Sequence, residues 1–296
     1  MEITFLGTSS MIPTKERNHV SLFLNYNGKG FLFDCGEGTQ RQMKIAGIPL
    51  AKINKIFISH WHGDHVLGLM GVIQSLGALD GDRVLEIYAP KGAKKYFKSM
   101  CESIAFDFRV KVKLFEVSSG KVFENDKILV TCASLKHGVP CVGYSFKEKD
   151  YRKVLMNQLE KLGVPEGPHI GKLQLGEDIV WKGNKIKFND CTKLVVGKKF
   201  SYVTDTLLVD NCYKLAQDSD LLVCEGTYLS DLKEKAEEYL HMTAEQASLL
   251  ASKSGVKQLV LTHFSARYKS NEELEKEAKT YFNNVKIAYD FMKVKV

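Results

Sequence analysis

The sequence predicts an α/β fold in which two β-sheets pack together with helices on their outer faces. Short strand-like runs crowd the first half of the chain, whereas strand and helix patterns alternate toward its end. Two sheets with outer helices accommodate this order better than one doubly wound parallel sheet. With 296 residues, 44% of them hydrophobic, the chain can bury a sizeable core as one large domain or two ordinary ones.

Composition excludes several classes of protein. A net charge of +7 and a mean hydropathy of −0.17 do not fit a disordered chain, and 23 Gly with 6 Pro do not fit a collagen. No apolar run approaches the roughly 18 residues of a membrane span, and the start of the chain lacks a signal-peptide pattern. We therefore expect a soluble cytoplasmic protein without membrane association. Its seven cysteines form no CxxC pair, which predicts reduced thiols.

The strands of the first half are short runs that alternate or are rich in β-branched and aromatic residues. Asn27-Gly28 is a hairpin turn signal between two of them. Pro90 precedes an amphipathic pattern that predicts a helix over Lys91–Ile104. In chain order, the predicted strands are Met1–Leu6, Val20–Asn25, Gly30–Asp34, Ile53–Ser59, Leu85–Ala89, Ile128–Ser134 and Cys141–Phe146.

The sequence pattern changes after residue 146. A predicted helix over Tyr151–Leu162 is followed by the breaker-rich stretch Gly163–Pro168, and residues 147–199 hold 12 Lys/Arg against 7 Asp/Glu. We therefore predict one domain over residues 1–296 that carries an inserted flexible arm over residues 147–190. The strands predicted beyond the arm are Phe200–Thr204, Leu221–Cys224, Lys257–Thr262 and Val285–Tyr289, and the helices are Leu207–Gln217, Thr243–Ser254 and Glu272–Phe282.

The most polar cluster of the chain follows the strand Ile53–Ser59. His60, His62, Asp64 and His65 place three imidazoles and a carboxylate within six residues, which are costly to bury without a shared cation. His60 and His62 are two residues apart on an extended segment, so their side chains point the same way. Neutral imidazole and carboxylate suit Zn²⁺, with Mn²⁺ or Fe²⁺ as alternatives.

This His-x-His-x-Asp-His pattern after a strand resembles the metallo-β-lactamase superfamily, a four-layer αβ/βα sandwich with a two-metal site at its edge. Further ligands are expected at strand ends, where His137, Asp205 and His263 stand. The resemblance implies two Zn²⁺ per chain. It assigns His60, His62 and His137 to one metal, Asp64, His65 and His263 to the other, and Asp205 as the bridge.

Within that superfamily, nearly the whole chain resembles the ribonuclease Z family of tRNA 3′-processing endonucleases. Phe33–Gln42, Pro13–Asn18 and His263–Tyr268 carry the likeness, and Gly163–Gly171 resembles the tip of the family's arm. The resemblance implies a homodimer in which the arm of one subunit positions precursor tRNA for the site of the other. The substrate-binding residues expected are Lys15, Arg17 and Arg267 in the first two loops, and Lys161, Gly167, Pro168 and Lys172 in the arm.

The same resemblance implies the chemistry. Hydroxide activated by two metals would attack the phosphodiester just after the discriminator nucleotide, leaving a 3′-hydroxyl on the tRNA and a 5′-phosphate on the trailer. Asp64 would orient and deprotonate the water, and His241 with Glu225 would transfer the proton to the leaving oxygen. Thr243 and Gln246 have capping-box spacing, which places His241 just before a helix. Trp61 and Cys224 depart from the family's usual residues.

Two other functions fit parts of the pattern. A lactonase, thioesterase, β-lactamase or other phosphodiesterase could share the metal scaffold, because function depends on the site and its surroundings. A non-catalytic RNA-binding protein with a structural zinc is the second alternative. Structural zinc sites usually use cysteine, so a predicted set of histidine and aspartate favours an open, catalytic site.

Overall fold

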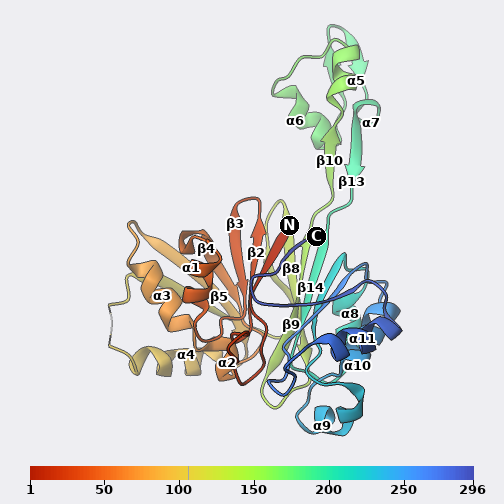
Figure 1. Cartoon of the computed structure of the whole chain (residues 1–296). Helices are drawn as coiled ribbons and strands as arrows, with labels where there is room; N and C mark the ends of the chain where they lie inside the picture. Colours follow the sequence, from red (N-terminus) through yellow and green to blue (C-terminus); the bar gives the residue numbers. More distant parts are fainter. Residues whose placement is uncertain (106) are drawn as a thin grey trace. The chain divides into compact units, whose positions relative to one another are not determined.

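The computed structural model describes residues 1–105 and 107–296, which divide into two compact units. The first comprises Met1–Glu124, Leu129–Phe146 and Lys199–Val296, and the second comprises Asn125–Ile128 and Lys147–Lys198. In the first unit two seven-stranded sheets lie face to face, with helices on the outer side of each (Figure 1). This confirms the predicted α/β sandwich of four layers. Among the described helices, none is long and apolar enough to cross a membrane.

The first sheet has the order β18-β1-β2-β3-β4-β5-β6, antiparallel between β1, β2 and β3 and parallel from β3 to β6. Helices α1, α3 and α4 cover its outer face (Figure 1). Its strands are β1 (Glu2–Gly7), β2 (Ser21–Tyr26), β3 (Lys29–Phe33), β4 (Ile53–Phe57), β5 (Arg83–Pro90), β6 (Val110–Val117) and β18 (Lys293–Lys295). The helices are α1 (Thr39–Ile45), α2 (Gly63–Val66), α3 (Leu69–Gly77) and α4 (Ala93–Glu102).

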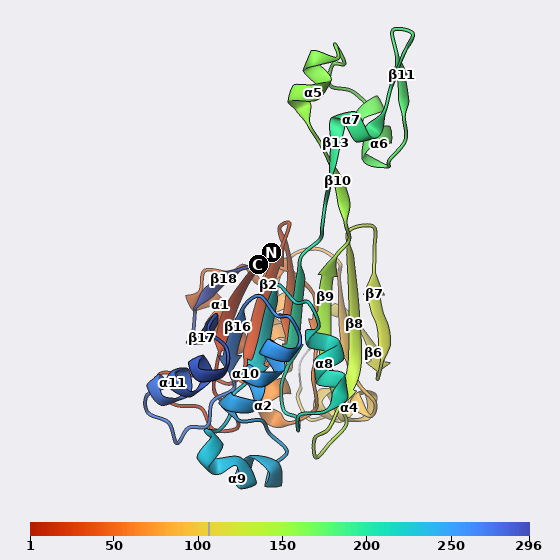
Figure 2. The ribbon, with the colours of Figure 1, turned by 90° about the vertical axis from the view of Figure 1, so that its right-hand side faces the viewer.

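The second sheet has the order β17-β16-β15-β14-β9-β8-β7, with β14 to β17 parallel. Helices α8, α10 and α11 lie beside it (Figure 2). Its strands are β7 (Gly120–Glu124), β8 (Ile128–Leu135), β9 (Cys141–Glu148), β14 (Lys199–Val203), β15 (Leu221–Glu225), β16 (Leu259–Thr262) and β17 (Val285–Ile287). The helices are α8 (Asp210–Ala216), α9 (Lys233–Glu238), α10 (Ala244–Lys253) and α11 (Glu272–Tyr281).

Aromatic side chains join the two sheets. The Phe33 ring meets the Phe200 ring edge-on at 5.2 Å between centroids, and the Phe57 and Tyr144 rings are 5.4 Å apart. All four side chains are fully buried. Phe33 and Phe57 end β3 and β4, so this packing holds the ends of those two strands against the second sheet. It thereby positions the loops that follow those ends.

The second unit has its own small core, built on Leu159, Val164, Leu173 and Ile179. Strand β10 pairs with β13 in antiparallel register, and β11 and β12 form a hairpin (Figure 2). The elements are β10 (Tyr151–Val154), α5 (Met156–Lys161), α6 (His169–Gln174), β11 (Ile179–Trp181), β12 (Asn184–Ile186), α7 (Phe188–Cys191) and β13 (Thr192–Val195).

The helix predicted over Tyr151–Leu162 is wrong in its first third. Tyr151–Val154 is strand β10, in which Tyr151 pairs with Val195, and the helix α5 begins only at Met156. Helical spacing of the apolar residues is visible locally, whereas the strand depends on a partner far along the chain. The arm predicted to end at residue 190 stops inside α7, while the second unit continues through β13 to Lys198.

Candidate metal centre

The side chains predicted to bind metal come from loops that follow strands of both sheets. The loop after β4 leads into α2, and other loops join β8 to β9 and follow β14 and β16. Parallel neighbours bring their carboxyl ends to one edge of a sheet. All seven predicted ligands belong to groups of three, within the described residues, whose ligand atoms lie within 4.8 Å of one another. These groups are His60/His62/His137, His60/His65/Asp205, Asp64/His65/His263 and Asp205/His241/His263.

The backbone is unusual where three strands end at this centre. Asp34 follows β3, Asp205 follows β14 and His263 follows β16, and their φ angles are +57°, +50° and +62°. Such left-handed conformations in residues other than glycine cost about 1–3 kcal/mol each and concentrate at functional sites. Each one turns the chain sharply, which aims the side chain at the centre.

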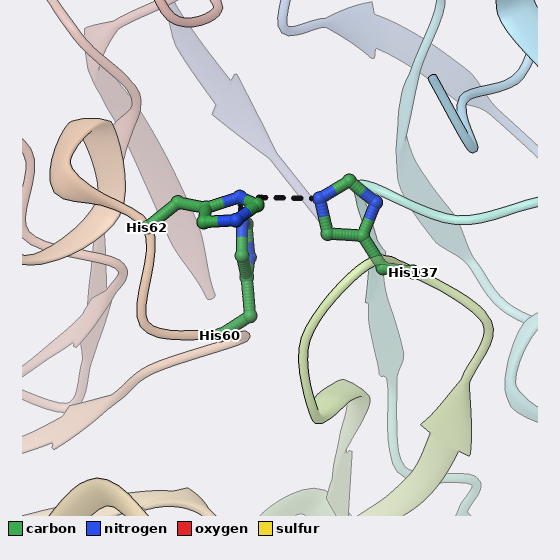
Figure 3. Close-up of side chains that lie close together, drawn as sticks. All are labelled: His60, His62 and His137. Carbon is green, nitrogen blue, oxygen red and sulfur yellow. Dashed lines mark hydrogen bonds between the residues drawn. The ribbon is translucent and has the colours of Figure 1, made fainter. Parts of the chain in front are cut away.

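The first group consists of three histidines (Figure 3). The Nδ1 atom of His62 lies 3.0 Å from Nε2 of His60 and 3.2 Å from Nε2 of His137. The Nδ1–H of His137 donates to the carbonyl oxygen of Leu240 at 3.2 Å, so its Nε2 carries a lone pair. Nε2 of His60, Nδ1 of His62 and Nε2 of His137 thus converge, and Nε2 of His137 has no proton to donate to its neighbours. A shared cation would satisfy all three.

The second group surrounds the carboxylate of Asp64. Nε2 of His65 lies 3.4 Å, and Nε2 of His263 3.6 Å, from its Oδ2. The carboxylate of Asp205 lies between the groups, with its oxygens 3.3 Å from Nε2 of His65, 3.3 Å from Nε2 of His263 and 4.0 Å from Nε2 of His60. The Nε2 atoms of His65 and His263 are buried without a hydrogen-bond partner. Buried polar atoms without partners are costly, so these residues fit a metal pair bridged by Asp205.

Outer hydrogen bonds orient the histidines. Oδ2 of Asp34, which is fully buried, lies 2.8 Å from Nδ1 of His65 and accepts the hydroxyl protons of Ser59 and Tyr202 at 2.8 and 2.7 Å. Because the Ser59 hydroxyl proton goes to Asp34, its oxygen can accept the Nδ1–H of His60 at 3.0 Å. A carboxylate behind a histidine is the usual support of a metal ligand. The sequence motif contained Asp34 at a strand end, yet this role was not predicted.

Burial and neighbouring charges shift the pKa values of the histidines in this cluster in opposite directions. Burial, reinforced by the other histidines, lowers the pKa of His60 well below its usual value, and burial also lowers the pKa of His137. These rings are therefore neutral, as metal ligands must be. Burial acts against a charge on His65, but Asp205, Asp34 and Asp64 together raise its pKa well above normal. Negative charge thus exceeds positive charge around His65, which favours a cation there.

His241 and Glu225 form an ion pair beside the second group. Nδ1 of His241 lies 2.8 Å from Oε2 of Glu225, and Nδ1 is 3.7 Å from Oδ1 of Asp205. Burial opposes protonation, but the charge and the hydrogen bond of Glu225 raise the pKa of His241 to about 9. At neutral pH the imidazole is therefore protonated and can donate from Nε2. The predicted capping box of α10 is present, with Gln246 N donating to Thr243 Oγ1 at 3.2 Å.

The three basic residues expected to bind substrate near the metals lie in different environments. Lys15 and Arg267 are exposed, and the Arg267 guanidinium stands 5.4 Å from the centre of the Tyr228 ring. Arg17 instead is only 8% exposed, and its guanidinium donates to Asn271 Oδ1 at 2.8 Å and to the carbonyl oxygen of Tyr268 at 2.7 Å. These bonds tie the loop that carries Lys15 to the loop that carries Arg267. Arg17 therefore positions these loops, and both terminal nitrogens of its guanidinium are already hydrogen-bonded.

The residues expected to bind substrate in the arm all lie in the second unit. Lys161 ends α5 and Lys172 lies in α6, and both side chains are exposed. Gly167 and Pro168 immediately precede α6. A Cβ atom on Gly167 would come within 2.8 Å of the His169 ring, so a larger residue there would have to displace this ring.

Trp61 and the cysteines do not contribute to the metal groups. The Trp61 side chain packs against the core under the first sheet, away from His60 and His62. All seven cysteines are free, as predicted. None of the candidate metal groups among the described residues contains a cysteine.

A cluster of histidine and aspartate at the edge of two packed sheets defines a metal-dependent hydrolase of the metallo-β-lactamase class. A family profile described as "Beta-lactamase superfamily domain" matches residues 181–264, and one described as "Anti-Pycsar protein Apyc1" matches residues 1–104. The solved structure of the metallo-beta-lactamase fold protein YhfI from Bacillus subtilis has a TM-score of 0.72 at 18% identity, covering 99% of both chains. That likeness shows the fold alone.

Relatives that match this chain over nearly their full length identify its family within this class. The chain is 41% identical to ribonuclease Z from Methanothermobacter thermautotrophicus, covering 100% of this chain and 97% of that protein. It is 38% identical to ribonuclease Z from Gloeothece citriformis, covering 100% and 96%. The structure of the short form of human tRNase Z has a TM-score of 0.74 at 26% identity, covering 100% and 99%. The chain therefore belongs to the ribonuclease Z family, and it is an enzyme, a metal-dependent nuclease.

Proposed function

We propose that this enzyme removes the 3′ trailer from precursor tRNA by cutting just after the discriminator nucleotide. The product tRNA ends in a 3′-hydroxyl and the trailer begins with a 5′-phosphate. The single observation that carries the proposal is the hydrogen-bonded pair of His241 and Glu225 beside the candidate metal groups, in a chain of the ribonuclease Z family. A phosphodiester needs both a stabilised attacking oxygen and a protonated leaving oxygen.

Seven side chains would hold two Zn²⁺ ions, with Mn²⁺ or Fe²⁺ as alternatives. His60, His62 and His137 would hold one ion, Asp64, His65 and His263 the other, and Asp205 would contact both. When bound, such a pair lowers the pKa of a water molecule and neutralises charge on the phosphodiester.

Side chains of the protein accept and donate the protons of the reaction. Oδ2 of Asp64 lies 3.4 Å from Nε2 of His65 and 3.6 Å from Nε2 of His263, beside the place proposed for a cation, so this carboxylate stays ionised and accepts a hydrogen bond from the attacking water. As the bond from phosphorus to the 3′-oxygen breaks, His241 donates its Nε2 proton to that oxygen. Glu225 stabilises the protonated ring before the transfer and keeps Nε2 directed outward.

Substrate recognition is separate from this chemistry. Lys15 and Arg267 are the exposed cations that we propose for phosphates close to the cut. We propose the second unit as the arm that holds the body of the tRNA, through Lys161, Gly167, Pro168 and Lys172. Folded RNA is read mainly through backbone and shape, which suits a unit rich in lysine. We further propose that the enzyme acts in the cytoplasm as a homodimer, the arm of one subunit serving the site of the other.

The central test is cleavage of a precursor tRNA with a 3′ trailer. We expect cleavage that stops when a chelator is added and returns with Zn²⁺. The 3′ end of the tRNA product should map to the discriminator, and the 5′ end of the released trailer to the nucleotide after it. Metal analysis is expected to find two ions per chain, as the two groups require. Chelator-resistant cleavage, or ends at scattered positions, would contradict the proposal.

Removing the arm should separate binding from chemistry. Glu148 N donates to the carbonyl oxygen of Lys198 at 2.8 Å, so a short glycine-serine linker can replace residues 150–196 without straining the junction. We expect the Michaelis constant for precursor tRNA to rise at least about tenfold, because several phosphate contacts are lost. Hydrolysis of bis(p-nitrophenyl) phosphate should stay within about twofold of the full chain, since the metal groups lie in the first unit. Equal loss of both activities would indicate a damaged fold instead.

A further inference from the structure

Helix α4 carries an unusual concentration of positive charge. Lys91, just before it, and Lys94, Lys95 and Lys98 within it are all exposed, and residues 91–98 contain no acidic residue. Lys98 pairs with Glu102 at 3.7 Å. Within the described part of the chain, the other three lysines form no ion pair with a carboxylate. This run lies outside the second unit, to which the sequence had assigned most of the excess charge.

These lysines oppose the stability of the helix that carries them. Lys94 and Lys95 stand in the first turn, where the helix dipole disfavours positive charge, and no acidic residue occupies that turn. Lys94 and Lys98 are four residues apart within the helix, a spacing at which equal charges repel. The carboxylate of Glu116 accepts the backbone N–H groups of Gly92 and Lys94, which satisfies the helix end without binding the lysine ammonium groups. Local conflicts of this kind are expected where a surface serves a ligand.

The fold places this helix next to the metal loop. β4 and β5 are parallel neighbours, so the segments that follow their carboxyl ends, the histidine loop and Lys91, emerge at the same edge of the sheet. Figures 1 and 2 show α2 and α4 at that end of the first sheet. The Tyr96 ring stacks on the ring of Trp61, with centroids 6.3 Å apart and 20° between the planes. Trp61 stands between His60 and His62, so the exposed face of α4 borders the catalytic loop.

An aromatic ring is available on the same helix. Tyr96 is 47% exposed although it is stacked on one side. Lysines beside an exposed aromatic ring are the combination by which proteins bind single-stranded nucleic acid, through phosphate contacts and base stacking. A double-helical stem would not offer unstacked bases to such a ring.

We propose that the exposed start of α4, with Lys91 just before it and Lys94, Lys95 and Tyr96 in its first turn, binds the single-stranded 3′ trailer of the precursor as it leaves the metal centre. The inference rests on the proposed function, because only a precursor of this kind has a trailer. The lysines contact trailer phosphates and Tyr96 stacks on a trailer base. Trailer length then becomes a determinant of affinity.

The test compares one precursor tRNA bearing either a single-nucleotide trailer or a trailer of about a dozen nucleotides, the length that one such surface covers. In the triple variant Lys91→Gln, Lys94→Gln, Lys95→Gln we expect the Michaelis constant for the long-trailer substrate to rise about tenfold, with kcat within about twofold. The short-trailer substrate should be processed as by the unmodified enzyme. Tyr96→Leu should act in the same direction, whereas Tyr96→Phe retains the ring and should not.

A matched control removes the same charge elsewhere. Lys253→Gln, Lys276→Gln, Lys279→Gln lies on α10 and α11 beside the second sheet, at exposed positions, and should leave both substrates unaffected. Binding of a trailer oligoribonucleotide should also become less salt-dependent in the α4 variant, with a log–log slope smaller by about 2, at roughly 0.7 per lost phosphate contact.

Each outcome decides the inference. An equal rise for long and short trailers would mean that α4 contacts the tRNA body, which overturns the assignment to the trailer. No change for either substrate would leave α4 as an ordinary solvated face and overturn it as well. If the unmodified enzyme cleaves neither substrate, the proposed function itself falls and this inference falls with it.

Discussion

Replacing Asp205 by asparagine should lower cleavage of precursor tRNA by about a thousandfold or more, because this carboxylate lies between the two candidate metal groups and is proposed to supply charge to both. Asp205 is 3% exposed and lies 3.3 Å from ring nitrogens of both His65 and His263. Its φ of +50° is a conformation that asparagine also tolerates, whereas alanine would add backbone strain. The Asp205→Asn substitution therefore changes charge with little change of shape.

Metal content provides the second measurement for this variant. We expect fewer than two ions per chain by elemental analysis of Asp205→Asn, together with the loss of cleavage. Asp210→Asn is a matched control, since it makes the same chemical change at an exposed position of α8. Full metal content with full activity in Asp205→Asn would exclude a bridging role.

Breaking the pair of His241 and Glu225 should cost about a hundredfold to ten-thousandfold in kcat, the usual range for a lost general acid. We expect His241→Ala to lose this factor while precursor binding changes little, because the ring acts on the leaving oxygen. If the two residues act as a unit, the double variant His241→Ala, Glu225→Gln should be about as slow as His241→Ala alone.

The dependence on pH distinguishes proton transfer from a structural effect. The Glu225 carboxylate outweighs burial and raises the pKa of His241 to about 9, so the acid form predominates below that pH and is lost as pH rises through it. In Glu225→Gln this support disappears, and the alkaline limb of the kcat profile should move to lower pH. The variant should therefore be impaired more at pH 8.5 than at pH 6.5.

The Glu225→Gln variant needs a folding control. The carboxylate also accepts the Thr206 N–H and the Thr227 hydroxyl at 2.7 Å each, so an amide group in its place would lose part of this support. Thermal unfolding and metal content should be compared with the unmodified enzyme. A uniform loss of rate at all pH values would indicate such a structural defect and would argue against a proton-donor role for His241.

Strands and helices with strong local patterns were predicted well. The strands β1 to β4 and the helices α4, α10 and α11 occur close to their predicted bounds. Several elements were not predicted, among them α1, β6 and β7. The edge strand β6 begins with the alternating run Val110–Leu114, a strand pattern that the prediction overlooked, whereas the short strand β7 alternates only weakly.

The residues of the candidate site also differ in how well they could be predicted. The ligands His60 to His65 are close in sequence and could be recognised by spacing alone. His137, Asp205 and His263 could be named only through resemblance to a family, because their approach depends on the pairing of distant strands. The roles of Asp34 and Arg17 could not be predicted from the sequence pattern. A buried carboxylate behind His65 and a buried guanidinium between two loops look, in sequence, like any other charged residue near a turn.

The class of the fold, the metal-binding chemistry of the histidine loop and the family could be predicted from the chain alone, because these depend on residue types at short, regular spacings. Other properties became visible only in the folded chain: which nitrogen of each histidine faces the centre, that Glu225 raises the pKa of His241, that Arg17 joins two loops, and that the lysines of α4 lie near the metal loop. These properties arise from burial and from contacts between residues far apart in the chain. Their electrostatic and packing energies do not exist until the two sheets have come together.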